Sequence, residues 1–501
     1  MPLILPGNVA SATASTTYDV ANSCRFNSAD EPCLYKAFGT PTSVDRWTIS
    51  YWVKRGNISG SSDDGVENIW GTISNDGTYN VDCRFNGSDD MRFTFWQGSS
   101  TVAKLNTTQK FRDTSAWYHM VNVWDSGNAT AGDRMKWYVN GVEVTSFSTD
   151  TNPSQDLDSY WNSDGSIATI GSMRSPAGSG SGNGEGSSGD YYLAEFVFCD
   201  GQAYAASDFG EFNEDSPTIW QPKDVSELTF GNNGFYLDFE DSSNLGNDAN
   251  GGTDLTEVNL AAADQCVDSP TNNFATLNPL HMSDPSANYF VDNGNNTLEA
   301  TNNDVDRLTG ATIHPMGIKG YFEYKILTDN NCRVALQEDG VALTKSNYTA
   351  LASGQFYGLY GDDITYANGG SSANHIVDYI DSSANGDIIG CAFDFTGSNR
   401  NVWWHLNGTY GNNGSGVGVP ATGAYPGITS TQLSASKNFE FVFMCNTGAS
   451  SSSIALNFGN GSFDGTAISS AGTNASFGTF EYDVPSGFGP ICTKTLNGTY
   501  S

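Results

Sequence analysis

Basic residues are scarce in this chain. It has 22 Lys and Arg residues against 56 Asp and Glu residues, which gives a formal net charge of −34. Nucleic acids bind proteins through basic surfaces, and anionic membranes attract basic segments for the same electrostatic reason. The charge balance therefore argues against a function in binding nucleic acids or membranes. An acidic surface favours solubility, and a salty environment would screen its self-repulsion.

Long apolar runs are absent as well. No stretch of about 18 apolar residues, the length that spans a bilayer, occurs in the chain. Residues 1–7 are apolar, but they lack a basic flank and are interrupted by prolines, so they do not resemble a signal peptide. We expect synthesis in a cytoplasm and, for any role outside a cell, release by another route such as lysis.

Paired cysteine motifs are also missing. The nine cysteines include no C-x-x-C spacing, which excludes zinc-finger-type and thioredoxin-like sites. Their odd number and wide spacing do not resemble a disulfide framework, although Cys24 and Cys33 are close enough in sequence to bridge. We expect reduced thiols, with Cys199, Cys391 and Cys445 buried inside apolar strands.

The chain also lacks helical periodicity, and its apolar residues instead follow strand patterns. No segment keeps a helical apolar period beyond about two turns, whereas aromatic residues make up 12% of the chain. In residues 47–53 every second side chain is large and apolar, as in a half-buried strand. Residues 135–144 contain Asn140-Gly141, a pair that tolerates positive φ at both positions and marks a β-hairpin. These patterns predict an all-β fold.

Five segments between residues 10 and 225 resemble the laminin G-like, concanavalin A-like lectin sandwich. They are WTISYWVKRG (47–56), AWYHMVNVWD (116–125), WYVNGVEV (137–144), IATIGSM (167–173) and YYLAEFVFCDGQA (191–203). The resemblance implies two packed antiparallel sheets. It says little about function, because this fold hosts lectins, glucanases and adhesive modules.

The last part of the chain resembles a SPRY domain. The segments that carry this resemblance are residues 317–326, 388–395, 401–408, 439–444 and 454–463. Specificity in that family resides on loops, and the long Gly/Asn/Ser loops at 366–374 and 409–418 depart from its pattern. The resemblance therefore implies a second β-sandwich without naming its partner.

Together these features predict an all-β chain of two antiparallel β-sandwich (jelly-roll) domains joined by a polar linker. An N-terminal arm covers residues 1–16, and the concanavalin A-like/laminin G-like sandwich covers residues 17–225. The linker covers residues 226–285 and includes a strand, and the SPRY-like sandwich covers residues 286–501.

Catalytic signatures are weak. Retaining glucanases of the concanavalin A-like fold use E-x-D-x-x-E, whose carboxylates suit a nucleophile and an acid about 5 Å apart. The only E-x-D here is Glu481-Tyr482-Asp483, with Ser486 in the place of the second Glu, and it lies in the other domain. His119 and His405 sit in aromatic strands and are predicted to be structural. We predict no catalytic residue and no enzymatic activity.

Calcium is the one ion that the acidic turns suggest, since it prefers carboxylate and carbonyl oxygens on loops. Asp63 and Asp64 occupy one such turn, and Asp89 and Asp90 occupy another. Neither turn follows the regular D-x-[DN]-x-[DN]-G pattern, so solvated turns are favoured and no cofactor is predicted beyond this calcium alternative.

Aromatic residues on loops are candidates for sugar binding, because the apolar face of a sugar stacks on a ring while Asp and Asn take its hydroxyls. One predicted group is Tyr160, Trp161 and Asn162. The second is Tyr410, Asn412 and Asn413.

The opening MPLILPGNVASATA, the laminin G-like block and the segment FYLDFEDSSNLGNDANGG…VDSPTNNFATLNP resemble structural proteins of marine tailed bacteriophages. This resemblance implies a virion protein, assembled in the host cytoplasm and released by lysis. Its partners would be other virion proteins and copies of itself, with the arm at 1–16 as an anchor.

Three roles remain open. The first is a tail fibre or spike subunit that binds host-surface glycans through sandwich loops. The second is a capsid decoration or head-fibre protein with a structural role, and the third is a polysaccharide depolymerase.

Overall fold

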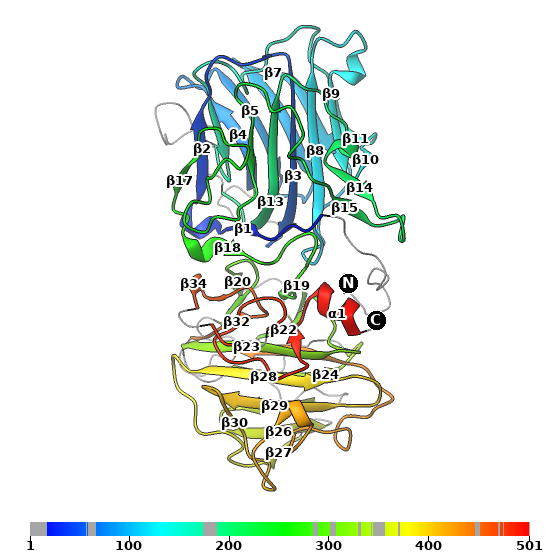
Figure 1. Cartoon of the computed structure of the whole chain (residues 1–501), viewed down its shortest axis with the longest axis vertical. Helices are drawn as coiled ribbons and strands as arrows, with labels where there is room; N and C mark the ends of the chain where they lie inside the picture. Colours follow the sequence, from blue (N-terminus) through cyan, green and yellow to red (C-terminus); the bar gives the residue numbers. More distant parts are fainter. Residues whose placement is uncertain are drawn as a thin grey trace. The chain divides into compact units, whose positions relative to one another are not determined.

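The computed structural model divides into two compact units, residues 14–271 and residues 272–501 (Figure 1). It describes residues 18–56, 58, 67–173, 188–283, 289–300, 307–328, 332–341, 343, 356–368, 371–445, 451–468, 471–473 and 475–499. The predicted arm at 1–16 and the predicted calcium ligands Asp63 and Asp64 lie outside these residues.

The first unit contains two extended sheets. Its strands are β1 (Ser23–Phe26), β2 (Cys33–Ala37), β3 (Arg46–Arg55), β4 (Glu67–Ile73), β5 (Tyr79–Phe85), β6 (Met91–Gln97), β7 (Ser100–Thr107), β8 (Tyr118–Asp125), β9 (Met135–Val139), β10 (Val142–Glu143), β11 (Phe147–Thr151), β12 (Ile167–Ile170), β13 (Tyr191–Asp200), β16 (Phe235–Leu237), β17 (Thr256–Val258) and β18 (Gln265–Cys266). One sheet has the order β10-β9-β8-β3-β13-β1-β18, with β16 also paired to β13. The other has the order β11-β7-β6-β5-β4-β12-β2-β17.

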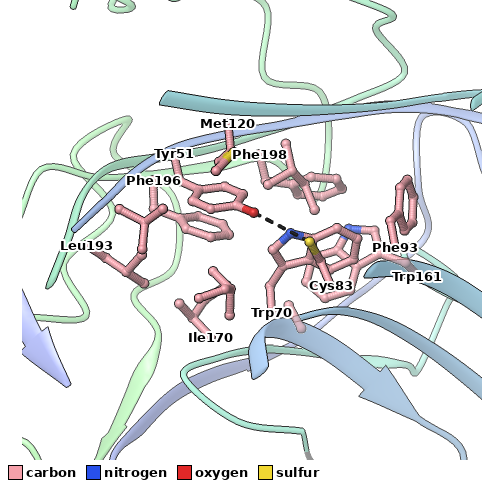
Figure 2. Packing of buried hydrophobic residues seen from close by; sticks show 14 of the residues in the cluster. Tyr51, Trp70, Cys83, Phe93, Met120, Trp161, Ile170, Leu193, Phe196 and Phe198 are labelled. Carbon is pink, nitrogen blue, oxygen red and sulfur yellow. Dashed lines mark hydrogen bonds between the residues drawn. The ribbon is translucent and has the colours of Figure 1, made fainter. Parts of the chain in front are cut away.

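Alternate side chains of the strands point into the space between these sheets and form the core. Trp47, Ile49, Tyr51 and Val53 of β3 are fully buried in a cluster with side chains of the facing sheet, among them Trp70. Figure 2 shows this packing, including the contact of the Tyr51 hydroxyl with the sulfur of Cys83 at 3.4 Å. The cluster is the sandwich core that the sequence predicts.

The outer face of the β8–β3–β13 sheet is also covered. A segment with β14 (Gly210–Phe212) and β15 (Trp220–Pro222) packs Phe209, Val225 and Phe230 against Val121 and Val197. Strand residues that would otherwise face water are therefore buried, which explains why every residue of β13 is buried.

The second unit also contains two sheets. Its strands are β19 (Leu277–Met282), β20 (Tyr289–Asp292), β21 (Thr297–Ala300), β22 (Arg307–Ala311), β23 (Lys319–Thr328), β24 (Cys332–Glu338), β25 (Phe356–Tyr360), β26 (Asp363–Asn368), β27 (Ser371–Ile376), β28 (Ile388–Asp394), β29 (Asn401–Leu406), β30 (Thr409–Tyr410), β31 (Phe439–Cys445), β32 (Ser452–Asn457) and β35 (Gly489–Pro490). The sheet orders are β19-β22-β31-β24-β25-β26-β27 and β20-β21-β32-β23-β28-β29-β30, with β35 paired to β23. The hairpin β33 (Ser462–Phe463) and β34 (Thr466–Ala467) and the short helix α1 (Thr493–Thr499) follow β32.

The prediction of an all-β chain with two antiparallel β-sandwiches is confirmed. The hairpin turns carry the expected backbone angles. Asn140 and Gly141 have φ values of 48° and 78°, and Asn407 and Gly408 between β29 and β30 have 48° and 85°. Both turns therefore use the left-handed conformation that Asn-Gly tolerates.

The structure corrects the extent of the linker. Residues 226–271 belong to the first unit, where β16 pairs with β13, β17 with β2 and β18 with β1. The polar composition of this segment is that of loops, but three short strands are enough to extend both sheets. Its apolar side chains, such as Phe235 and Leu255, enter the sandwich core.

All nine cysteines are buried, and none is disulfide-bonded. Cys24 and Cys33 lie on strands of different sheets. Burial raises the pKa of the Cys24, Cys199 and Cys391 thiols, which keeps them protonated. Across the described residues no helix is long and apolar enough to cross a membrane.

Candidate carbohydrate-binding site

A pocket opens in the first unit where β5 begins and β6 ends. The turn between β11 and β12 closes its other side. Its volume is about 570 Å³, and its lining residues are Tyr79, Phe95, Gln97, Ser154, Asp156, Leu157, Asp158, Tyr160 and Ser163. Strand ends position one wall rigidly, while the polar turn supplies the other.

Tyr79 and Tyr160 form the aromatic part of this pocket. Their ring centroids are 5.1 Å apart and their planes differ by 15°, so the rings are stacked. Both side chains are half-buried. Burial, together with the nearby charge of Asp76, raises the pKa of Tyr160 and keeps its hydroxyl protonated.

Polar groups surround the stacked pair. Gln97, Asp156 and Asp158 are exposed and line the same pocket. Amide and carboxylate groups can take the hydroxyls of a sugar while an aromatic ring contacts its apolar face. The pocket thus combines the two kinds of contact that recognise carbohydrate.

The prediction for Trp161 is wrong. Its side chain is fully buried and packs 5.0 Å from Trp70 and 5.5 Å from Phe38, ring centroid to ring centroid (Figure 2). Because the chain turns between Tyr160 and Trp161, the first ring faces the pocket and the second enters the core. Trp161 is a core residue.

The prediction for Asn162 is also wrong. Its side chain is fully buried and its φ is 70°. Its amide donates to Asp200 at 2.7 Å and to the carbonyl of Ser43 at 2.9 Å, and its oxygen accepts from Asn233 at 2.8 Å. These bonds hold three loops together and leave Asn162 no access to a ligand.

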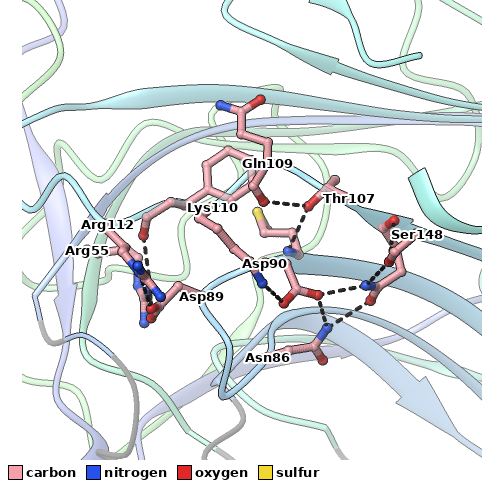
Figure 3. A network of polar contacts seen from close by, with 12 residues as sticks. Arg55, Asn86, Asp89, Asp90, Thr107, Gln109, Lys110, Arg112 and Ser148 are labelled. Atoms are coloured by element: carbon pink, nitrogen blue, oxygen red, sulfur yellow. Dashed lines mark hydrogen bonds and ion pairs between the residues drawn. The ribbon is translucent and has the colours of Figure 1, made fainter. Parts of the chain in front are cut away.

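Asp89 and Asp90 are held by cations of the protein itself, as Figure 3 shows. Asp89 pairs with Arg55 at 3.0 Å and with Arg112 at 2.7 Å, and Asp90 pairs with Lys110 at 2.7 Å. Burial acts to raise the pKa of Asp90, but hydrogen bonds from Lys110 and two asparagines outweigh it and lower the pKa.

These contacts stand against Asp89 and Asp90 as calcium ligands. A divalent cation would have to replace the arginine and lysine partners that already neutralise both carboxylates. Among the residues that the structure describes, no three His, Cys, Asp or Glu side chains are grouped to hold a metal ion.

The second predicted sugar group is split by the structure. Tyr410 lines a separate pocket of the second unit. The side chain of Asn412 accepts from the amide of Gly414, and that of Asn413 donates to the carbonyl of Pro426. The two asparagines therefore stabilise the loop after β30, and the structure places neither in the lining of the Tyr410 pocket.

Tyr79 and Gln97 also line the pocket, and no sequence pattern indicated them. They lie at strand ends, and a pattern that marks strand faces does not indicate which ends meet. The available signal was the polar turn at 74–78, which places Tyr79 directly after a loop.

Residues 35–177 match the family described as the Concanavalin A-like lectin/glucanases superfamily. The first unit thus carries a lectin/laminin G-type fold. A search of curated proteins finds no match.

Solved structures similar to this chain include the heptameric SAP-like pentraxin from Limulus polyphemus, with 18% identity and a TM-score of 0.28, covering 38% of this chain and 80% of that one. The SPRY domain of human HERC1 has 14% identity and a TM-score of 0.25, covering 36% and 96%. Domains LG4-5 of the mouse laminin α1 chain have 9% identity and a TM-score of 0.29, covering 95% and 99%.

Proposed function

We propose that the protein is a virion appendage subunit, a tail fibre or spike, that binds host-surface glycans through the Tyr79–Tyr160 pocket. It acts as a binding protein and not as an enzyme. It assembles in the host cytoplasm with copies of itself and with other virion proteins, and it leaves the host by lysis.

The observation that carries the binding role is the stacked tyrosine pair beside three exposed polar side chains in one pocket. The lectin-type fold of the first unit supports it. The virion role is supported by the resemblance of the chain to phage structural proteins.

Binding of the full chain to an array of bacterial surface polysaccharides tests the first part. We expect Tyr160→Ala to weaken binding roughly tenfold, because a lost aromatic contact of ~1.4 kcal/mol corresponds to that factor. Tyr425→Ala, which removes a tyrosine of the other unit that is 44% exposed, is the matched control. Equal loss in both variants, or binding unaffected by Tyr160→Ala, would refute the assignment of this pocket.

Gold-labelled antibody against the protein on purified phage particles tests the second part. Label at the tail supports the fibre or spike. Label over the head would instead favour the capsid decoration role, and unlabelled particles would refute the virion proposal.

A further inference from the structure

A second pocket, in the second unit, lies between the β29–β30 hairpin and the C-terminal segment 471–483. Its volume is about 380 Å³. The side chains of His405, Tyr410, Glu481, Tyr482 and Asp483 line it. Two carboxylates therefore lie beside three aromatic rings in this pocket.

The three rings form a box. The ring of Tyr410 lies 5.1 Å from that of His405 at an interplanar angle of 78°, and the ring of Tyr482 lies 5.2 Å from it at 73°. Both tyrosines therefore stand nearly perpendicular to the imidazole. The faces of aromatic rings are electron-rich and attract organic cations.

A buried hydrogen-bond chain fixes the imidazole. The Gly408 amide donates to His405 Nδ1 at 3.1 Å, so Nε2 carries the proton and donates to the Tyr321 hydroxyl at 2.7 Å. That hydroxyl donates to Glu323 at 2.9 Å. Burial lowers the pKa of His405 to about 3, so the ring is neutral and brings no positive charge to the pocket.

The same carboxylate positions the opposite wall. Glu323 accepts the backbone amides of Glu481 and Tyr482, each at 2.8 Å. Close packing around Gly472 keeps the wall in place, since a Cβ on this glycine would lie 2.2 Å from the backbone of Tyr482. Both walls of the pocket are therefore held by one buried group, and the box is formed before any ligand arrives.

The pocket carries the negative charges of Glu481 and Asp483, with no ion pair to them from the described residues. Asp483 accepts the amide and hydroxyl of Thr473 at 2.6 and 2.7 Å, and these bonds lower its pKa and keep it ionised. Among the described residues, no Lys or Arg forms an ion pair with Glu481 or Asp483. The buried hydroxyl of Tyr410 likewise has no hydrogen-bond partner in the described part of the chain.

We propose that this pocket binds a small organic cation with an alkylated ammonium head, held by the aromatic box of His405, Tyr410 and Tyr482 and by the carboxylates of Glu481 and Asp483. Aromatic boxes with nearby carboxylates suit such heads, which are large, weakly hydrated and positively charged. A metal ion fits less well, because no group of three ligating side chains occurs among the described residues. The proposal is independent of glycan binding by the first unit.

Choline and 3,3-dimethylbutan-1-ol provide a matched pair of probes, because they share their shape and differ in the positive charge. Saturation-transfer NMR on the full chain is expected to show choline bound and the neutral alcohol unbound. The double variant Glu481→Gln/Asp483→Asn keeps the shape of the pocket and should weaken choline binding roughly tenfold or more. Tyr482→Leu should weaken it as well while both carboxylates remain.

Glu214→Gln/Asp215→Asn is the control, since it makes the same change in net charge at exposed residues of the first unit and should leave choline binding unchanged. The melting temperature of each variant verifies folding. Equal binding of the alcohol and choline, no binding of choline to the unaltered protein, or full binding by the Glu481→Gln/Asp483→Asn variant would each overturn the proposal.

Discussion

The Tyr236 hydroxyl donates a hydrogen bond of 2.7 Å to Glu195, a glutamate buried at a bulge within β13. Glu195 has a φ of 51°, an unusual angle for a strand residue that is not glycine, and it also accepts from Tyr18 at 3.2 Å. Burial raises its pKa to about 8, although both tyrosine bonds act to lower it. Glu195 is therefore mostly protonated at neutral pH, unlike the exposed carboxyls of the chain.

This relationship predicts a pH dependence of stability. The pKa of Glu195 is higher in the folded state than in the unfolded state, so the folded state binds the proton of this carboxyl more tightly. The stabilisation is complete below about pH 4.5, declines as the pH rises and is lost above about pH 8. Glu195→Gln, which stays neutral, should remove this decline.

The measurement is the free energy of unfolding of the first unit in urea at pH 5, 7 and 9. The variant should become more stable relative to the unaltered protein by a few kcal/mol (~2–4) between pH 5 and pH 9. Glu214→Gln, at an exposed position, should show no such trend. Parallel curves for Glu195→Gln and the unaltered protein would contradict the assignment of a raised pKa.

The second prediction is that Cys332 and Cys445 form a disulfide on oxidation. They are directly opposite in the β24–β31 pairing, and their sulfurs lie 2.7 Å apart. Opposite residues of antiparallel strands have Cα atoms about 4.5–5.5 Å apart, within the range of a disulfide. Added diamide should therefore accept two electrons and two protons from this pair and produce a Cys332–Cys445 bridge.

Peptide mapping without reductant should recover the bridge, and Cys332→Ser should abolish it without creating another. Cys391→Ser, at a buried cysteine of the same unit, should leave the bridge in place. Finding all nine thiols still titratable after oxidation would disprove the prediction.

Substitutions of Tyr160 and Trp161 should have different effects, the first on glycan binding and the second on the stability of the fold. Trp161→Ala removes a fully buried ring and should cost about 3–5 kcal/mol of unfolding free energy. Tyr160→Ala removes a half-buried ring and should cost less than about 1.5 kcal/mol while impairing glycan binding. Chemical unfolding followed by tryptophan fluorescence compares them, and similar losses would show that Tyr160 is also a core residue.

The carboxylate of Asp89 should be structural. Asp89→Asn removes the carboxylate that pairs with Arg112 and one of the two carboxylates that pair with Arg55. We expect a loss of roughly 2–4 kcal/mol, because a buried arginine loses part of its compensation. Asp150→Asn, at an exposed position, is the control and should change the melting temperature little. A loss of calcium-dependent stability in Asp89→Asn alone would instead restore the calcium hypothesis.

Much of the fold could be predicted from local patterns. Period-two alternation predicted β3, and Asn140-Gly141 predicted the turn between β9 and β10. The extent of the linker was wrong because β16, β17 and β18 are two or three residues long and are stabilised by partners far away in the sequence. No local pattern encodes such pairing.

The candidate site was harder to predict. Tyr160, Trp161 and Asn162 are consecutive and similar in composition to a sugar-binding loop, yet Tyr160 lines the pocket while Trp161 and Asn162 are buried. Likewise, the sequence does not show that Glu481 and Asp483 share a pocket with Tyr410, because only the fold brings them together. Which side of a turn a residue faces depends on tertiary contacts such as that between Asn162 and Asp200.

Because all nine cysteines are buried, the reaction of their thiols with an added reagent measures local unfolding of the protein. Five of the nine thiols belong to the first unit and four to the second. A thiol reagent can reach each one only when the surrounding strands separate, so its labelling rate reports the free energy of local opening. Mass spectrometry of partly labelled protein would then show which sandwich opens first, without any added probe or engineered residue.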